Sequence, residues 1–507
     1  MTGGARLIRQ QELEKRLWDA ANALRGPVDP GDFKNYVFPM LFWKWLSDTH
    51  AWERAQAVEE FGTDVDPEVE ADYHRFALPP GTSWGEVTTT TSNLGHAIQT
   101  AFSRIQQANP QTLAGVFGDA AWANKERLPE ASLVNLVQAF QGLQLDPAHV
   151  SNDLLGGAYE YMLKMFADAS GAKAGEFFTP RAIVRLIVRI LDPAPGEEIV
   201  DPACGSGGML VETINTVRDH GGDTRTLRLY GQEQNLTTAG IARMNLFLHD
   251  IEDFAIVRGD TLREPAYRDP SGHLRRFDVV IANPPFSLKN WGHEAWTADP
   301  RAICGLPPRN NGDMAWIQHM VASMKPGTGR VGVVMPHGAL FRGGAEGAIR
   351  ECLIGKDLLE AVIGLPPNLF YSTSIPACVL VFRAAKAKER VGHVLFVDGS
   401  ARFAKGRNQN TMSIDDAAAI AEAYRTGQDP DGHDGVQVRL VPYAEIEGNG
   451  FDLNIGRYLK NTTTDQIDLD TALANYLTAR EARLASEQAM FQRLAAAGIA
   501  DLGDLDD

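Results

Sequence analysis

The sequence predicts an α/β fold in which a mostly parallel sheet is covered by helices on both faces, with a helical domain before it and a helical tail after it. In residues 166–400, short apolar or β-branched runs alternate with helical stretches, as strand–helix–strand units do. Residues 1–165 show helical periodicity instead, without the alternation of a half-buried strand. A chain of 507 residues is long enough for roughly two or three domains.

The N-terminal domain, residues 1–165, is predicted to be a small helical bundle. An early helix places Leu13, Leu17 and Leu24 on one face. The aromatic run at residues 36–46 (YVFPMLFWKWL) is predicted to be an internal helix of this bundle, because apolar stripes at helical spacing usually form a core.

The middle domain is predicted to contain seven strands, at residues 198–201, 227–232, 254–259, 277–282, 329–335, 359–365 and 377–382. Helices are predicted between them, at residues 209–220, 238–250, 314–325 and 346–353. Ligands of such sheets bind beyond the carboxyl ends of the strands. We therefore expect a functional site in the loops that follow the strands.

The last part of the chain, residues 401–507, is predicted to be an extension that ends in one long helix, residues 465–497. Leu477, Leu484 and Phe491 are seven residues apart, which favours a coiled-coil or bundle helix that binds a partner. Docking of this helix on the chain's own N-terminal bundle is an equally open alternative.

Composition indicates an ordinary globular protein, with 44% hydrophobic and 22% charged residues. No apolar stretch reaches the roughly 18 residues of a membrane span, so we expect a cytoplasmic protein without membrane contact. The cysteines are far apart and form no C-x-x-C pair, which predicts reduced thiols and neither a disulfide nor a metal site. They are Cys204, Cys304, Cys352 and Cys378.

A glycine-rich loop, Asp-Pro-Ala-Cys-Gly-Ser-Gly-Gly at residues 201–208, follows the first predicted strand and precedes a helix. Glycines there let the backbone approach a ligand closely. Leu210 stands where the dinucleotide fingerprint has its third glycine, and the Lys-Ser/Thr pair of a P-loop is missing. The sequence therefore disfavours both phosphate-binding interpretations.

Three successive predicted strands are each followed by an acid: Asp201, Glu233 and Asp260. A carboxylate at Asp201 would repel a pyrophosphate, but it suits a ligand that carries an ammonium and a sulfonium group, as S-adenosylmethionine does. Glu233 is placed to bond ribose hydroxyls, and Asp260 can accept a hydrogen bond from an adenine amino group. The ordered set predicts an S-adenosylmethionine site, although each acid alone fits a solvated loop.

The fourth strand is followed by Asn283, Pro284, Pro285 and Phe286. An aromatic amino nitrogen is a poor nucleophile because its lone pair is delocalised into the ring. The Asn283 side-chain oxygen and the Pro284 carbonyl can each accept a hydrogen bond from one N–H group of this nitrogen, which frees its lone pair. The two prolines stiffen the loop that carries these acceptors. Phe286 offers a flat face on which an extruded base can stack. The motif predicts methylation of an exocyclic amino group.

These motifs resemble the γ-type adenine methyltransferases, and most closely the modification subunits of type I restriction-modification systems. The resemblance also covers the aromatic run, GEFFTPR at 175–181, DMAW at 313–316, VVMP at 333–336, GLP at 364–366 and FDLNI at 451–455. It implies a seven-stranded, Rossmann-like methyltransferase sheet with a reversed last strand, N6-methylation of adenine in DNA, and a set of cofactor contacts. These are Glu176, Phe177, Phe178, Thr179, Pro180, Arg181, Asp201, Gly205, Ser206, Gly207 and Glu233.

The resemblance also implies partners. The formal net charge of −17, from 48 basic and 65 acidic residues, does not by itself favour DNA binding, which depends on neutralising phosphates. Such subunits associate with a specificity subunit that reads double-stranded DNA, which removes the difficulty. A second modification subunit is expected as well, and cleavage would need a separate restriction and translocation subunit.

Residues 287–313 follow the catalytic motif and contain Lys289, Trp291 and Arg301 among glycines and prolines. We predict a flexible loop that closes over the extruded base and contacts DNA phosphates through these side chains. A variable surface insertion is the alternative interpretation.

Three other functions fit parts of the sequence. The same chemistry would methylate a glutamine amide or a guanine amino group in RNA. A single-chain methyltransferase that reads its own DNA site is a second alternative, although the residues after the sheet leave little room for a recognition domain. The third is a noncatalytic scaffold, against which the intact set of acids and Asn283 argues.

Overall fold

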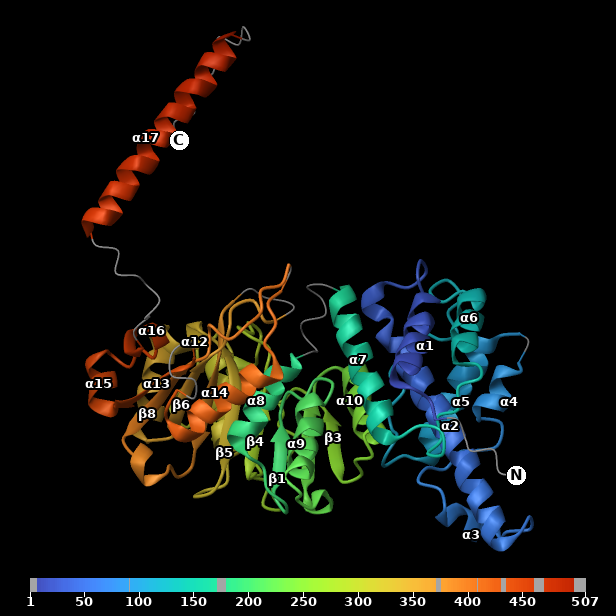
Figure 1. The fold of residues 1–507 in the computed structure, drawn as a ribbon. Coiled ribbons are helices and arrows are strands. Elements are labelled where there is room, and N and C mark those ends of the chain that lie inside the picture. The colour runs from blue at the N-terminus through green and yellow to red at the C-terminus, as the bar shows by residue number, and fades with distance from the viewer. Residues whose placement is uncertain are drawn as a thin grey trace. The chain divides into compact units, whose positions relative to one another are not determined.

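The fold combines N-terminal helices with one mixed sheet, and a separate long helix follows (Figure 1). The computed structural model describes residues 7–90, 92–170, 179–370, 375–407, 409–429, 435–459 and 469–496. Met1–Tyr458 form one compact unit and Leu459–Asp507 a second. Each unit is considered by itself.

The N-terminal helices enclose an aromatic core. They are α1 (Gln10–Asn22), α2 (Lys34–Phe61), α3 (Pro67–Asp72), α4 (Trp84–Thr88), α5 (Leu94–Ala108), α6 (Glu130–Phe140) and α7 (Asn152–Ser170). At its centre the Trp43 ring lies 4.8 Å from that of Trp84 and 5.5 Å from that of Phe102. The Trp43 indole donates to the Thr82 carbonyl at 2.9 Å, so its one polar atom is satisfied. The prediction of an internal helix at residues 36–46 is confirmed, because all of them are buried within α2.

The sheet contains nine strands in the part of the chain that the structure describes, two more than predicted. They are β1 (Glu198–Asp201), β2 (Arg228–Glu233), β3 (Phe254–Arg258), β4 (Val279–Ala282), β5 (Arg330–Pro336), β6 (Leu359–Gly364), β7 (Ala377–Arg383), β8 (His393–Asp398) and β9 (Gln437–Pro442). The two missed strands are β8 and β9. In β9, QVRLVP, polar and apolar residues alternate and only Val441 is buried, so it does not form the continuous apolar run of the predicted strands.

The strands lie in the order β3-β2-β1-β4-β5-β7-β6-β8-β9. Neighbours from β3 to β5 pair in parallel, and β7 runs antiparallel between β5 and β6. β8 pairs in parallel with β6, and β9 pairs antiparallel with β8. The mostly parallel sheet and the reversed strand at 377–382 are thereby confirmed.

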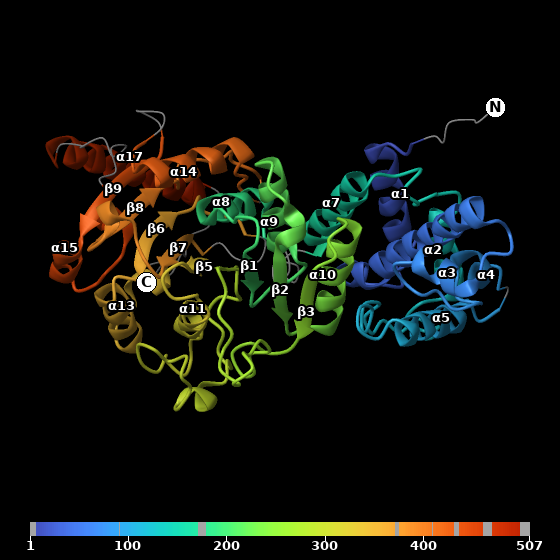
Figure 2. The same ribbon diagram turned by 90° about the horizontal axis from the view of Figure 1, so that it is seen from below.

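Helices cover both faces of the sheet. One face packs against α8 (Arg181–Leu191), α9 (Gly208–Asp219), α10 (Leu236–Leu248) and α14 (Ile414–Thr426). The other carries α11 (Asp313–Ala322) and α13 (Ala345–Gly355) (Figure 2). α10 belongs to both hydrophobic cores: Ala239, Ala242 and Leu246 pack with the sheet, while Met244 and Phe247 pack with the N-terminal helices. The boundary predicted at residue 165 falls within α7, and the two cores on either side of it share one compact unit.

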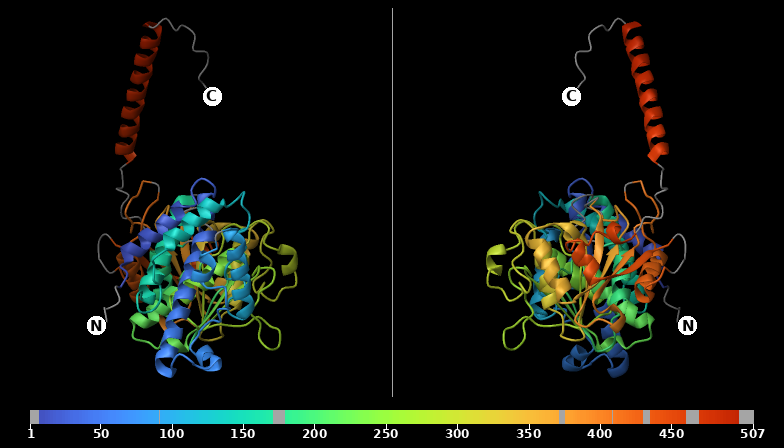
Figure 3. Two further views of the ribbon diagram at one scale, coloured as in Figure 1. Left: turned by 90° about the vertical axis from the view of Figure 1, so that its right-hand side faces the viewer. Right: turned by 90° about the vertical axis from the view of Figure 1, so that its left-hand side faces the viewer.

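The boundary predicted at residue 400 is wrong. Residues 401–458 supply α14, β9, α15 (Tyr443–Gly448) and α16 (Ile455–Tyr458), which complete the sheet and its cover. The second unit begins only at Leu459. It contains α17 (Leu469–Ala496), one continuous helix where the sequence predicted residues 465–497 (Figure 3).

One prediction about the cysteines is also wrong. Cys304 and Cys352 are bonded as a disulfide, with their Cα atoms 5.6 Å apart. Their separation of 48 residues gave no sign of this contact, because the fold brings the loop after β4 against α13. Cys204 and Cys378 are buried free thiols.

Among the described residues, no helix is both long and apolar enough to cross a membrane.

Candidate active site

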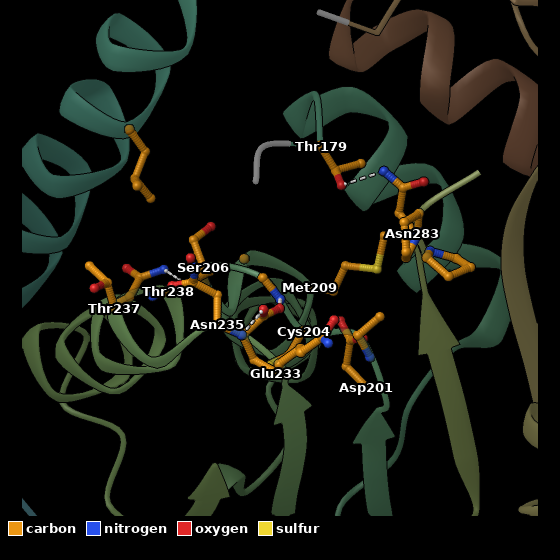
Figure 4. A pocket seen from close by; sticks show the side chains of 18 of the residues that line it. Thr179, Asp201, Cys204, Ser206, Met209, Glu233, Asn235, Thr237, Thr238 and Asn283 are labelled. Atoms are coloured by element: carbon orange, nitrogen blue, oxygen red, sulfur yellow. Dashed lines mark hydrogen bonds between the residues drawn. The ribbon is translucent and has the colours of Figure 1, made fainter. Parts of the chain in front are cut away.

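A cavity of about 1500 Å³ lies at the carboxyl ends of the central strands. The loops after β1, β2, β3 and β4 line one part of it, and residues of α1 and α7 line another. Figure 4 shows Asp201, Glu233 and Asn283 at the strand ends, with their side chains directed into the same space. The predicted convergence of these loops is therefore found in the structure.

The glycine-rich loop turns sharply between β1 and α9. Gly205 and Gly207 have φ of 52° and 79°, a left-handed conformation that glycine adopts without a Cβ clash. The Cys204 amide donates to the Gln232 carbonyl at 3.1 Å, and the Asn245 side-chain amide donates to the Ser206 carbonyl at 2.9 Å. These bonds tie the loop to β2 and to α10, so its backbone is held open toward the cavity.

Glu233 joins the loops that follow β1 and β2. One carboxylate oxygen accepts from the Gly205 amide at 3.2 Å, and the other accepts from the Asn235 amide at 2.8 Å. Asp260 turns the loop after β3 in a similar way, because its Oδ1 accepts from the Leu262 amide at 3.1 Å. Both acids line the cavity, and their hydrogen bonds also fix the loops that form it.

Asp201 is the most deeply buried of the three acids, at 2% exposure. Burial, reinforced by the nearby Glu233 charge, raises its pKa to about 8, against a partial offset from the hydrogen bond of the Ala203 amide. An ionised Asp201 is therefore costly unless a cation approaches it. This environment favours a positively charged ligand group at the end of β1.

The side chain of Asn283 is fixed by Thr179. The Asn283 Nδ2 donates to the Thr179 hydroxyl at 2.9 Å, as Figure 4 shows. Its Oδ1 is buried and has no hydrogen-bond partner among the described residues. A buried acceptor without a partner is unfavourable, so its presence at a cavity indicates a site for a donor supplied by a ligand.

Aromatic side chains stand beside this acceptor. Phe286 packs edge-on against Phe370, with ring centroids 5.9 Å apart, and both line the cavity. Trp316, from α11, lines it too and is 5% exposed. These rings can hold a planar group next to Asn283.

Family models match nearly the whole chain. The N-6 DNA methylase model matches residues 150–466, and the HsdM N-terminal domain model matches residues 13–140. The chain belongs to the N-6 DNA methylase family. This confirms the resemblance read from the motifs, and with it an S-adenosylmethionine-dependent enzyme that methylates N6 of adenine in DNA. A guanine in RNA and a glutamine amide are disfavoured as substrates.

Individual relatives agree with this assignment. The type I restriction enzyme HindI methylase subunit of Haemophilus influenzae is 37% identical over 320 residues, 62% of this chain and 70% of that protein. The MjaIX methylase subunit of Methanocaldococcus jannaschii is 30% identical over 478 residues, 88% of this chain and 84% of that one. The crystal structure of a type I methyltransferase subunit from Streptococcus thermophilus matches with a TM-score of 0.78 and 29% identity, covering 89% of this chain and 100% of that one.

In this N-6 DNA methylase, the structure describes only part of the segment before α8 that was predicted to contact the cofactor. Glu176, Phe177 and Phe178 lie outside the described residues. Pro180 is the N-cap of α8, and the Thr179 hydroxyl accepts the hydrogen bond from the Asn283 amide. Arg181 is half exposed and pairs with Glu160 of α7 at 3.5 Å.

The structure argues against the DNA contacts predicted for Trp291 and Arg301. Trp291 is completely buried, and Arg301 is 3% exposed. The Arg301 guanidinium donates to the carbonyls of Thr261 and Leu262 at 2.8 and 2.7 Å and pairs with Asp299 at 2.7 Å. Arg301 therefore attaches the 287–312 segment to the loop after β3, while the Trp291 indole donates to the Pro308 carbonyl at 3.0 Å within that segment.

Lys289 is exposed, so its predicted DNA contact stays a prediction.

Sequence reasoning missed how the N-6 DNA methylase motif is supported. Thr179 was predicted only as a cofactor contact, and Trp316 and Phe370 were given no role. Asp313 begins α11 and bonds the chain directly after Phe286. The Asp-Met-Ala-Trp motif that contains Asp313 was the one available signal, and it carried no indication of this contact.

Proposed function

We propose that this chain is the catalytic subunit of a type I modification complex, and that Asn283 Oδ1 accepts a hydrogen bond from the amino group of an extruded adenine. The observation that carries the proposal is the unsatisfied, buried Asn283 Oδ1 at the wall of the cavity. Thr179 holds the Asn283 amide by its NH₂ group and leaves the oxygen for the substrate.

The residues around the cavity fit S-adenosylmethionine. The cavity of about 1500 Å³ exceeds the roughly 300–1,000 Å³ of a typical single-ligand pocket, so there is room for a cofactor and a base. Asp201 would face the cationic methionine end, Glu233 the ribose and Asp260 the adenine amino group. Gly205, Ser206 and Gly207 would let the backbone approach the ligand, and Thr179, Pro180 and Arg181 would border it. When bound, the cofactor supplies an electrophilic methyl group.

The chain's own residues prepare the amino group for this methyl. Asn283 Oδ1 and the Pro284 carbonyl each accept a hydrogen bond from one N–H group of the amino nitrogen. These two bonds direct the nitrogen lone pair away from the ring and toward the methyl group. Phe286 stacks on the base and keeps it out of the duplex. Because Asn283 remains neutral, it orients the amino group without removing a proton before the transfer.

Substitution of Asn283 tests this mechanism. Asn283→Ala should lower the methylation rate by about 10²–10³-fold, since one preorganised acceptor is lost, and should change the cofactor Kd by less than about twofold. The measurement is incorporation of radiolabelled methyl groups into DNA from a host that lacks this modification, with the chain co-purified with the product of its neighbouring reading frame. Asn290→Ala, an exposed asparagine nearby, is the matched control. A wild-type rate for Asn283→Ala would refute the proposed role.

The second unit has an exposed apolar surface that suits binding to a partner protein. The apolar side chains of α17 are largely exposed: Leu473, Tyr476, Leu477, Leu484, Met490 and Phe491. An apolar helix of this kind fits the helices of another subunit. We infer that α17 binds the specificity subunit, which reads the double-stranded DNA. A second modification subunit and a separate restriction and translocation subunit would complete the complex.

A further inference from the structure

The chain directly after Phe286 is held by the first residue of α11. The Ser287 amide donates to Asp313 Oδ1 at 2.7 Å, and the Gly312 amide donates to the Leu288 carbonyl at 3.0 Å. Ser287 has a φ of 52°, a left-handed conformation that is unfavourable for a residue with a Cβ. A hydrogen bond to a carboxylate is among the stronger ones, and here it offsets that cost.

The second oxygen of Asp313 is bonded by Arg342. The Arg342 Nη2 and Nη1 lie 2.6 and 3.1 Å from Asp313 Oδ2, and Asp313 is 1% exposed. Burial raises the pKa of Asp313, while the Ser287 amide and Arg342 act in the opposite direction. Arg342 also reaches Glu346 at 3.3 Å, so its charge keeps one partner if Asp313 is replaced.

Arg342 is itself fixed by its neighbours. Its guanidinium lies across the start of α12 (Gly338–Phe341), where a Cβ at Gly338 would come within 2.7 Å of it. Arg350, from α13, donates to the Arg342 carbonyl at 2.7 Å. Helices α12 and α13 therefore fix Arg342, Arg342 bonds Asp313 of α11, and Asp313 contacts the chain directly after Phe286.

We propose that Asp313 is a positioning residue for methyl transfer: with Arg342 it holds Ser287 in its left-handed conformation and so sets the direction of Phe286 and of the Pro284 carbonyl. The proposal rests on the function proposed above for Asn283 to Phe286. It assigns a role to Asp313, the first residue of the Asp-Met-Ala-Trp motif, whereas Trp316, the last residue of the motif, lines the cavity itself.

Glu360 provides a matched control for the Asp313–Arg342 pair. It is a buried carboxylate at 2% exposure, and Arg383 donates to it at 2.6 Å. The Arg383 side chain is 27% exposed and that of Arg342 is 30% exposed. The Glu360 pair joins β6 to β7 and lies outside the catalytic loop. Loss of either pair disturbs a buried charge, but only loss of Asp313 should disturb Ser287.

The first experiment measures amide hydrogen exchange in the chain without DNA. Asp313→Ala should raise the exchange rate of peptides that contain Ser287 by about tenfold or more, while peptides of the glycine-rich loop keep their protection. Asp313→Asn, which retains an acceptor, should give a smaller increase, and Glu360→Ala should leave these peptides unchanged. Unaltered exchange in Asp313→Ala, or an equal increase in Glu360→Ala, would overturn the proposal.

The second experiment measures single-turnover methylation by the complex on unmodified host DNA. Asp313→Ala should lower the rate by about 10–100-fold with an unchanged cofactor Kd, and Asp313→Asn should recover part of it. Glu360→Ala should stay within about twofold of wild type below its unfolding temperature. A wild-type rate for Asp313→Ala would refute the positioning role. If the unaltered complex methylates no DNA while the exchange result holds, the proposed function fails and the support of the loop by Asp313 stands.

Discussion

Asp201 and Asn283 end neighbouring strands of the sheet, β1 and β4, and burial acts on them differently. A buried carboxyl changes its charge state, and the pKa of Asp201 rises to about 8. A buried amide has no charge to lose, so Asn283 keeps its hydrogen-bonding capacity at every pH. The cofactor side of the site should therefore respond to pH, and the base side should not.

Cofactor affinity should consequently rise with pH. A cationic ligand binds the ionised form of Asp201, and that form becomes dominant only as pH passes about 8. Without ligand the sign is opposite for stability: the folded pKa exceeds the unfolded one, so this group's contribution to stability is lost between pH about 4 and 8.

The comparison with Asp201→Asn isolates this effect, because titration of the ligand's own amino group is common to both proteins. The ratio of the variant's Kd to the wild-type Kd, measured by calorimetry, should grow on the order of tenfold from pH 6.5 to 8.5. A ratio that stays constant would show that Asp201 does not face the cation.

Asp201, Glu233, Asp260 and Asn283 could be located from the sequence because each lies at or just after the end of a strand. The residues that hold these side chains in place could not be predicted. Thr179 and Asn283 are 104 residues apart, and Ser287 and Asp313 are 26 apart, so only the folded chain brings them together. The error at Arg301 has a related cause: an arginine in a glycine- and proline-rich segment resembles a surface cation until its acceptors, the Thr261 and Leu262 carbonyls, are known.

At the scale of elements, the segment after the catalytic loop depends on the Cys304–Cys352 disulfide. Cys304→Ser should lower the free energy of unfolding by about 2–4 kcal/mol in oxidising buffer, because the bond restricts the unfolded chain across 48 residues. Dithiothreitol should affect wild type similarly and leave the variant unchanged. Urea unfolding with and without reductant measures both. Cys378→Ala, which alters a buried free thiol, should keep the dependence on reductant; a wild type indifferent to reductant would contradict the prediction.

Strand patterns predicted the first seven strands to within a residue or two because five of them have mostly or wholly buried side chains. The failure at β9 shows the limit of such patterns. β9 lies at the edge of the sheet, where Arg439 pairs with Glu445 at 2.7 Å, and its apolar residues alternate with polar ones instead of forming a continuous run. Backbone pairing with β8, which the side chains do not reveal, makes it a strand.

For the whole molecule, an acidic chain that modifies DNA needs another source of DNA affinity. Leu477→Glu combined with Leu484→Glu should abolish co-purification with the product of the neighbouring reading frame, and with it methylation, while cofactor binding persists. Ala482→Glu combined with Ser486→Glu adds the same charges about half a turn away on α17 and should be tolerated. Equal loss of co-purification in both pairs would mean that charge, rather than the apolar face, is responsible.

The place of β7 in the sheet has a consequence for synthesis of the chain. β6 does not pair with β5. Both strands pair with β7, which is synthesised later. While the ribosome is still adding residues before Ala377, β3, β2, β1, β4 and β5 can pair, but β6 has no neighbour to which it can attach. The half-sheet that carries Asp201, Glu233 and Asn283 can therefore form first, with its β5 edge open until β7 arrives.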